Sequence, residues 1–291
     1  MVRSLALASL IWLLASTAAA CATQQASPGE ADAPVEQTPG PPVVVTPTIT
    51  NGLVRSEPPL ISTYPVGRSP FALAFDGKNI WVANYSDDTV TKLSKDAGTI
   101  LGTFPVGTNP VALAFDGESI WVANSGLTVG NSRDSVTKLA LDGTQVSTFF
   151  TGRTPRALAF DGESIWVANT DDDTVTKLAL DGREMGTFAV GGGPAALAFD
   201  GESIWVANSS DDTVTKLTRH GERLGIFPVG RLPVALLFDG ESIWVANLFG
   251  FTVTKLALDG RELGAFSAGT GPRSLVFDGS NIWVPTGATR P

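Results

Sequence analysis

The sequence predicts an all-β fold in which one four-stranded unit is repeated around a ring, and three observations predict it. A Phe-Asp-Gly motif recurs six times along the 291 residues, at offsets of 40, 45, 39, 39 and 39 residues, and a fixed period of this length is typical of propellers and arrays. Each copy contains an Ile-Trp-Val run that is apolar on both sides of an extended strand, so both faces of its sheet must be covered. Asp-Gly pairs separate many of the apolar runs, and they are strong hairpin signals.

Each repeat divides into four short strands. In the copy that begins at Pro194, we expect strands at residues 195–199, 203–207, 213–217 and 223–229. Asp200-Gly201 lies between the first two strands, and His220-Gly221 lies between the last two, where most other copies have Asp-Gly. Gly and Asp tolerate the positive φ that tight hairpin turns require. A four-stranded meander with two apolar faces is covered when copies stack radially, which is the arrangement of a β-propeller.

The repeat count predicts six blades and a way to close the ring. The six motif tryptophans are Trp81, Trp121, Trp166, Trp205, Trp244 and Trp283. The last copy ends at Pro291, after its second strand, whereas residues 60–67 match the fourth-strand segment 225–230 and have no first strand before them. We expect this N-terminal strand to complete the C-terminal blade, because closure removes exposed sheet edges. The third strand of that blade would come from residues 43–54 or be absent.

The N-terminus has the features of an export signal. Residues 1–20 contain Arg3, then an apolar core, then small residues, the order of a secretory signal. The run that ends in Ala20-Cys21 resembles a bacterial lipobox, and Cys21 is the one cysteine of the chain. The resemblance implies lipidation of Cys21, membrane attachment and a place in the bacterial cell envelope, at the outer membrane in a Gram-negative host because Ala22 follows. Ordinary cleavage after Ala-x-Ala is the alternative, because Ala18 stands where Leu is usual.

The composition indicates the domain organisation and excludes one class of partner. Residues 21–59 are rich in Pro, Ala and Thr and have no hydrophobic period, so they predict a disordered tether before a propeller domain at residues 60–291. The chain has 20 Lys+Arg against 29 Asp+Glu. It has no basic cluster of the kind that neutralises phosphates, which argues against nucleic acid as a partner.

The repeat resembles the YVTN/YncE-like and streptogramin-lyase-like (NHL-type) propellers over about residues 60–285. The resemblance rests on the apolar strand, Asp-Gly, the Ile-Trp-Val-Ala-Asn strand and the Thr-Val-Thr strand. For function it implies one alternative, a lyase that uses a histidine base and a bound divalent cation. The only histidine, His220, occupies a hairpin turn, and the sequence offers no Cys/His cluster, Ser/His pairing or Gly-rich phosphate loop. We therefore expect a non-catalytic binding or scaffolding module for protein or cell-wall material, without a cofactor. A divalent cation at residues 171–173 and the metal-assisted lyase are the alternatives.

The internal copies separate structural from functional residues. The repeated Asp and Trp are expected to serve the blade, as is the Asn at the end of each second strand, for which ligand contact is an alternative. The repeated Lys of the third strand is expected near the solvated rim. Two sets of loops at one face vary instead, and their candidate binding residues are Arg68, Asn109, Arg153, Arg156, Arg231, Arg273, Tyr85, Leu248, Phe249 and Phe251.

Two hypotheses concern these variable loops. The arginines could converge on the channel mouth and engage a planar anion, or pair with aspartates of adjacent loops, the arrangement we favour. Phe251 replaces the Asp found at Asp88, Asp173 and Asp212. The apolar run around it could form a contact patch or pack on the neighbouring blade.

Overall fold

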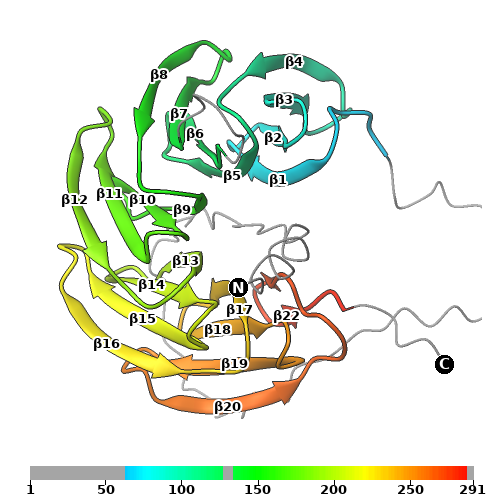
Figure 1. Ribbon diagram of the computed structural model, residues 1–291. Helices are drawn as coiled ribbons and strands as arrows, with labels where there is room; N and C mark the ends of the chain where they lie inside the picture. The colour runs from blue at the N-terminus through cyan, green and yellow to red at the C-terminus, as the bar shows by residue number, and fades with distance from the viewer. Residues whose placement is uncertain (1–62, 127–133, 287–291) are drawn as a thin grey trace, which may run out of the picture.

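The computed structural model describes residues 63–126 and 134–286, and these form an all-β chain of five four-stranded antiparallel sheets and one two-stranded sheet. Figure 1 shows the sheets arranged around a centre, with the first strand of each innermost and the fourth outermost. The predicted repeat of four-stranded blades is confirmed. No helix capable of crossing a membrane occurs in these two described ranges. The predicted signal peptide, Cys21 and the tether lie outside the described residues.

The strands follow one another in chain order within each blade. Blade 1 contains β1 (Pro70–Phe75), β2 (Asn79–Asn84), β3 (Thr89–Ser94) and β4 (Ile100–Pro105); blade 2 contains β5 (Pro110–Phe115), β6 (Ser119–Asn124), β7 (Ser135–Ala140) and β8 (Gln145–Phe150); blade 3 contains β9 (Pro155–Phe160), β10 (Ser164–Asn169), β11 (Thr174–Ala179) and β12 (Glu184–Ala189); blade 4 contains β13 (Pro194–Phe199), β14 (Ser203–Asn208), β15 (Thr213–Thr218) and β16 (Arg223–Pro228); blade 5 contains β17 (Pro233–Phe238), β18 (Ser242–Asn247), β19 (Thr252–Ala257) and β20 (Glu262–Ser267); the partial blade contains β21 (Val276–Phe277) and β22 (Ile282–Trp283).

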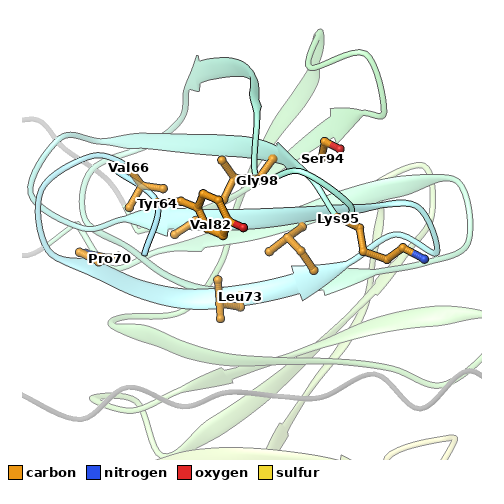
Figure 2. A pocket seen from close by; sticks show the side chains of 10 residues that line it. Tyr64, Val66, Pro70, Leu73, Val82, Ser94, Lys95 and Gly98 are labelled. Atoms are coloured by element: carbon orange, nitrogen blue, oxygen red, sulfur yellow. The ribbon is translucent and has the colours of Figure 1, made fainter. Parts of the chain in front are cut away.

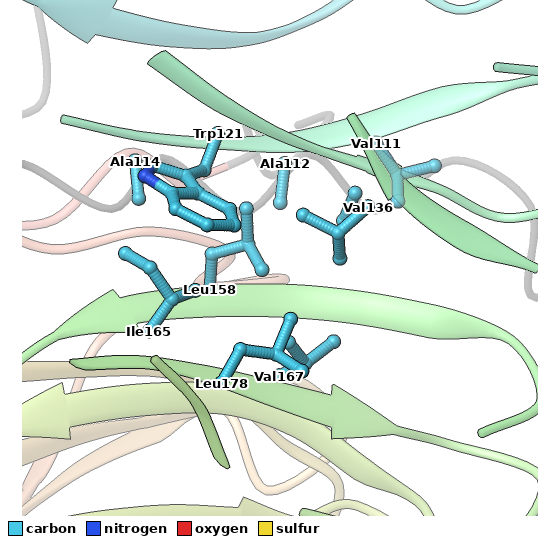
Figure 3. Close-up of a cluster of buried hydrophobic side chains, with 10 residues drawn as sticks. Val111, Ala112, Ala114, Trp121, Val136, Leu158, Ile165, Val167 and Leu178 are labelled. Atoms are coloured by element: carbon cyan, nitrogen blue, oxygen red, sulfur yellow. The ribbon is translucent and has the colours of Figure 1, made fainter. Parts of the chain in front are cut away.

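The core lies between blades, as the apolar faces of the strands require. Figure 3 shows one such layer, in which Trp121 of β6 faces Leu158 and Ile165 of the next blade. All three side chains are almost completely buried. The second strands of blades 2 to 5 are buried along their length, whereas the fourth strands of these blades have only exposed and half-buried residues. Radial stacking of blades with two apolar faces thus accounts for the fold.

A repeated polar network holds each tryptophan in place. In blade 3, the Asp161 carboxylate accepts hydrogen bonds from Trp166 Nε1 at 2.8 Å and from the backbone N–H of Ser164 at 2.7 Å. Lys177 lies over the Trp166 ring at 5.2 Å and donates to the Arg219 carbonyl of blade 4. Our expectation that these lysines lie near the solvated rim is wrong: Lys177 is buried, because its charge joins two blades instead of reaching solvent.

The Asn at the end of each second strand is also structural. Asn84 is fully buried, and its Nδ2 donates to Thr89 Oγ1 at 3.0 Å and Thr91 Oγ1 at 2.9 Å. Its Oδ1 accepts from the backbone N–H of Gly67 at 3.1 Å. The predicted local role is confirmed, though threonine hydroxyls supply most of the partners in place of backbone. The equivalent Asn side chains of the other four complete blades are also fully buried and donate through Nδ2 to hydroxyl groups of the third strand, but their Oδ1 atoms have no hydrogen-bond partner in the described residues.

The sixth blade departs from the prediction of a closed six-bladed ring. The chain has five complete blades plus β21 and β22, and residues 63–69 form no strand with them. Leu73 of blade 1 is consequently 48% exposed, although its equivalent Leu158 is 1% exposed. Trp283 is 43% exposed, while the other motif tryptophans are at most 6% exposed. The predicted six blades are thus found as five complete blades and a sixth that contributes only two short strands within the described residues.

Blade 1 therefore presents an open apolar pocket, roughly 310 Å³ in volume, on the face that a preceding blade would cover. Figure 2 shows Leu73 and Val82 beside Tyr64, which arrives from the segment before β1. The Tyr64 ring lies so close to Gly98 that a Cβ on that glycine would sit 2.0 Å from it. In the same way, a Cβ on Gly143 of blade 2 would sit 2.0 Å from the Phe104 ring of blade 1. Tyr64 thus occupies the place that a fourth-strand aromatic of a preceding blade would take.

Acid should weaken this fold through its turn aspartates. Burial disfavours the ionised form of Asp76, but hydrogen bonds from Trp81 and the Asn79 backbone outweigh it and lower the pKa. A hydrogen bond from Trp283 is the main cause that lowers the pKa of Asp278 to about 2 from 3.8. Because the folded pKa lies below the unfolded one, this stabilisation is present above about pH 4 and is lost as the pH falls towards 2. Urea midpoints measured across that window should decline; a flat profile would contradict this account.

Candidate functional site

The candidate site is the end of the propeller that carries the variable loops, here called the loop face. It consists of the turns between second and third strands and the loops that enter each first strand. Backbone hydrogen bonds join the two kinds of loop within a blade: Tyr85 N–H donates to the Ser69 carbonyl at 3.0 Å, and Leu248 N–H donates to the Leu232 carbonyl at 2.9 Å. The face is therefore built from paired loops on a rigid scaffold, which is where binding residues commonly lie.

Aspartates of the loop face bind successive blades together. Asp88 Oδ1 accepts from the backbone N–H of Asn109 in the next blade at 2.8 Å, and Asp212 Oδ1 accepts from Leu232 N–H at 2.8 Å. Both acceptor and donor residues have positive φ, between 52° and 56°. Asn and Asp tolerate this conformation better than most residues. The turn aspartates thus stabilise the neighbouring loop.

Two of the predicted arginines pair with loop aspartates. Arg68 Nε lies 2.5 Å from Asp87 Oδ1, and Arg153 Nε lies 2.5 Å from Asp172 Oδ1. Hydrogen bonds from the Arg68 backbone and then its side chain lower the pKa of Asp87. The pairing that we favoured for Arg153, Arg156, Arg231 and Arg273 is confirmed for Arg153, and Arg68 is paired in the same way; both side chains are exposed and already compensated. They are poor candidates for anion recognition.

A second group gathers around Tyr85 near the inner strands. The Tyr85 ring centroid lies 5.7 Å from that of Phe71, and Asn109 Nδ2 donates to the Tyr85 carbonyl at 3.2 Å. Burial raises the pKa of Tyr85, while the charge of Arg156 acts to lower it. The structure therefore brings together three predicted residues, Tyr85, Asn109 and Arg156, from blades 1, 2 and 3.

A third group forms an apolar surface on blade 5, here called the blade-5 patch: Leu232, Leu248, Phe249 and Phe251. Phe249 and Phe251 are 53% and 49% exposed, whereas Leu248 is buried. The exposure of the two rings favours the contact patch over packing of the rings on the neighbouring blade, while Leu248 contributes to the interior. Arg231 is exposed at the edge of the patch, and its carbonyl accepts from Phe249 N–H at 3.2 Å.

Phe251 occupies the structural position of the turn aspartates without their interaction. Its carbonyl accepts from Ala268 N–H at 2.9 Å, as the Asp212 carbonyl does from Val229 N–H at 3.0 Å. Its φ is 54°, and its side chain has no acceptor for Gly271, one of two positive-φ glycines in the following loop. A bulky residue in this region is an outlier that carries backbone strain. Phe251 therefore combines a strained backbone with an aromatic ring that faces solvent.

One predicted residue and two residues that were not predicted lie elsewhere around the loop face. Arg273 is exposed before β21, in the partial blade. Sequence reasoning missed Phe71 and Leu232. A signal for each was present: Phe71 is the aromatic member of its set of equivalent positions, and Leu232 stands where other blades have Ser69, Asn109, Thr154 and Gly193.

The alternative of a metal-assisted reaction finds no assembled site in the described ranges. His220 lies in the turn between β15 and β16, at the end of its blade opposite the loop face. Within residues 63–126 and 134–286, no group of three or more His, Cys, Asp or Glu side chains is placed to hold a metal ion. The chemistry that the loop face offers there is apolar contact and an arginine beside aromatic rings.

Comparison with known proteins identifies the fold. No family model and no curated protein sequence matches the chain. A streptogramin B lyase structure is similar at 18% identity and a TM-score of 0.64, over 75% of this chain and 76% of that one. A catalytically inactive virginiamycin B lyase from Staphylococcus aureus with quinupristin matches at 15% identity and 0.64, over 75% and 78%. A functionally unknown protein from Desulfotomaculum acetoxidans matches at 17% and 0.57, over 70% of each. At these identities the likeness concerns architecture alone, and it shows that the chain has a β-propeller fold.

Proposed function

We propose that this propeller is a non-catalytic binding or scaffolding module that engages protein, or cell-wall material, through the blade-5 patch. The observation that carries the proposal is Phe251: it is half exposed at φ 54°, in a position where other blades use an aspartate that stabilises the fold. Exposed aromatic side chains supply much of the binding energy at protein interfaces. Phe251 lowers the stability of the free protein but suits contact with a partner, and this combination supports a binding role for the residue.

The chemistry of the patch favours a protein surface as the occupant. Phe249 and Phe251 offer two aromatic rings, and Arg231 adds a cation at their edge. Aromatic residues and Arg are enriched at the centres of protein interfaces. The matching surface would be apolar at its centre with an acidic group facing Arg231. The module would be displayed on the bacterial envelope by a lipid on Cys21, which is the second part of the proposal.

The proposal includes a closed ring of six blades. Tyr64 lies against Gly98 in the place of a fourth-strand aromatic, and Leu73 and Trp283 are exposed on the two sides of the gap. Figure 1 places blade 1 and β22 at the two ends of the array. Closure by residues 60–67, with a third strand from residues 43–54 or none, would cover both apolar surfaces. Closed propellers leave only short, protected edges.

The binding proposal predicts that Phe249→Ser combined with Phe251→Ser removes the partner. Purified chain is used to capture envelope proteins and cell-wall fragments, and the variant is expected to lose the material that wild type retains. Leu263→Ser is the matched control, because Leu263 is 43% exposed on β20 of the same blade but lies outside the loop face. Retention of the same material by the double variant at wild-type levels would refute the patch.

Phe251→Asp separates loss of binding from loss of folding. An aspartate tolerates the positive φ and places an acceptor near Gly271 N–H, as Asp212 does for Leu232 N–H at 2.8 Å. We expect this variant to gain about 0.5–1.5 kcal/mol in unfolding free energy, the usual net worth of one hydrogen bond, while it loses the partner. A less stable variant that still binds would contradict both halves of the argument.

A further inference from the structure

Arg156 has an unusual position for an arginine. In each complete blade the pairing of the first two strands slips by one residue at the second position of the first strand. The five residues at this bulge are Phe71, Val111, Arg156, Ala195 and Val234. First strands of successive blades contact one another around the centre, as Figure 1 shows. Bulges redirect side chains, and among the five complete blades Arg156 is the one charged residue at this position; in the sixth copy the equivalent residue is Arg273.

The guanidinium of Arg156 lacks the compensation that other loop-face arginines have. Arg153, three residues earlier, lies 2.5 Å from an Asp172 oxygen, and Arg68 has the same relation to Asp87. Arg156 makes no hydrogen bond or ion pair with any residue in the described part of the chain. Burial lowers its pKa, with a smaller opposing influence from Tyr85. A partly desolvated cation without a carboxylate partner favours an anion from outside.

The surroundings of Arg156 suit an anion with an apolar body. Tyr85 is near enough to interact electrostatically with the guanidinium, and its ring lies 5.7 Å from Phe71. Asn109 fixes the Tyr85 backbone by donating to its carbonyl at 3.2 Å. Val111 is buried beside these rings. One cation, one phenol and apolar walls therefore meet at the inner end of the loop face.

We propose that Arg156 binds the carboxylate of a small aromatic or aliphatic acid, whose apolar body rests on Phe71 and Tyr85. A guanidinium engages a carboxylate through two parallel hydrogen bonds. A single cation balances one negative charge, whereas a phosphate dianion would retain a charge on a face rich in aspartates such as Asp88 and Asp134. The site lies on blades 1 to 3, away from the blade-5 patch, so it stands or falls independently of the proposed docking function.

The test uses phenylacetate as the probe, with phenylacetamide as its neutral isostere and inorganic phosphate as the alternative anion. Calorimetric titration of the full chain should give saturable binding of phenylacetate, at least ten-fold weaker binding of phenylacetamide and no saturable binding of phosphate. Arg156→Met should weaken phenylacetate at least ten-fold, and Arg156→Lys should fall between. Arg153→Met is the matched control, because its side chain is already paired, and it should leave binding unchanged.

A second readout follows the tyrosine itself. The chain has two tyrosines, Tyr64 and Tyr85, so a Tyr64→Phe background isolates Tyr85 in an ultraviolet titration. Arg156 acts to lower the pKa of Tyr85, so a carboxylate bound to Arg156 should raise it further. Absence of phenylacetate binding, equal binding by Arg156→Met, or phosphate binding as tight as phenylacetate would each overturn the proposal. If Arg156→Met does not fold, Arg156→Lys and an unmoved Tyr85 titration decide the question.

Discussion

Replacing Asp161 with alanine is expected to lower the free energy of unfolding by about 3–5 kcal/mol, the usual cost of breaking a buried ion pair. Asp161 is 1% exposed and accepts from Trp166 Nε1 and two backbone N–H groups. Lys177 Nζ lies 3.8 Å from its carboxylate. Alanine would leave these buried donors and the cation without their acceptor, and unsatisfied buried groups are costly. Urea unfolding monitored by tryptophan fluorescence measures the change.

Asp278 provides the matched control for this network. It accepts from Trp283 Nε1 at 2.6 Å and from two backbone N–H groups, the same set of bonds, but it is exposed in the partial blade. Water can replace its hydrogen bonds, so Asp278→Ala should shift the urea midpoint far less than Asp161→Ala. Equal shifts would show that burial between blades does not set the value of the network.

The second large effect concerns Leu73 and the gap in the ring. If the N-terminal segment closes the sixth blade, Leu73 is buried in the intact protein, and Leu73→Ala should cost about 2–5 kcal/mol, as for a core leucine. In a chain that begins at Thr63 the same change should cost less than about 1 kcal/mol, because such a chain lacks most of the N-terminal segment that would cover Leu73, whose side chain is 48% exposed where only the described residues surround it. The comparison is a cycle that isolates the contribution of the deleted residues.

Leu263 supplies the control for this cycle. It is 43% exposed on the outer strand of blade 5, away from the gap, so Leu263→Ala should cost the same in the long and the short chain. A small, equal cost of Leu73→Ala in both chains would contradict closure by the N-terminal segment. A large cost in the long chain alone would support it.

The fold was predictable because the same pattern of strands and turns occurs six times in the sequence. The run Ser203–Asn208 shows no alternation of apolar and polar residues, and it is buried throughout. A sheet covered on both faces could therefore be inferred from one copy and checked against the others. The hairpin between Phe199 and Ser203 follows from Asp200-Gly201, where the glycine has a φ of 95°. Local chemistry and global packing therefore agree in every complete blade.

The lysines and the last blade resisted prediction for a different reason. The role of Lys177 depends on a carbonyl of the next blade, and a strand pattern carries no information about such contacts. Closure of the ring depends likewise on segments at opposite ends of the sequence. Contacts of this kind depend on tertiary packing, so they cannot be predicted from the sequence of one repeat.

The candidate site was predictable only as a set of positions. Comparison of copies identified Arg153 and Arg156 together, although the structure shows one paired with Asp172 and the other without a described partner. The neighbours that make Tyr85 and Phe251 distinctive, Phe71 and Leu232, stand at positions equivalent to Arg156 and Asn109, which the sequence analysis named as candidates, but these two residues were not singled out themselves. Departures from the repeat located the face, and contacts between blades gave its parts their different roles.

The most direct test of the binding account is site-specific photo-crosslinking from the loop face in the native envelope. A benzophenone side chain replaces Phe249 in one chain and Leu263 in another, and cross-linked products are identified by mass spectrometry. The account predicts a defined partner from position 249 that is absent from position 263 and disappears when Phe251→Asp is added to the first chain. The same products from both positions, or products from position 249 that survive Phe251→Asp, would contradict it.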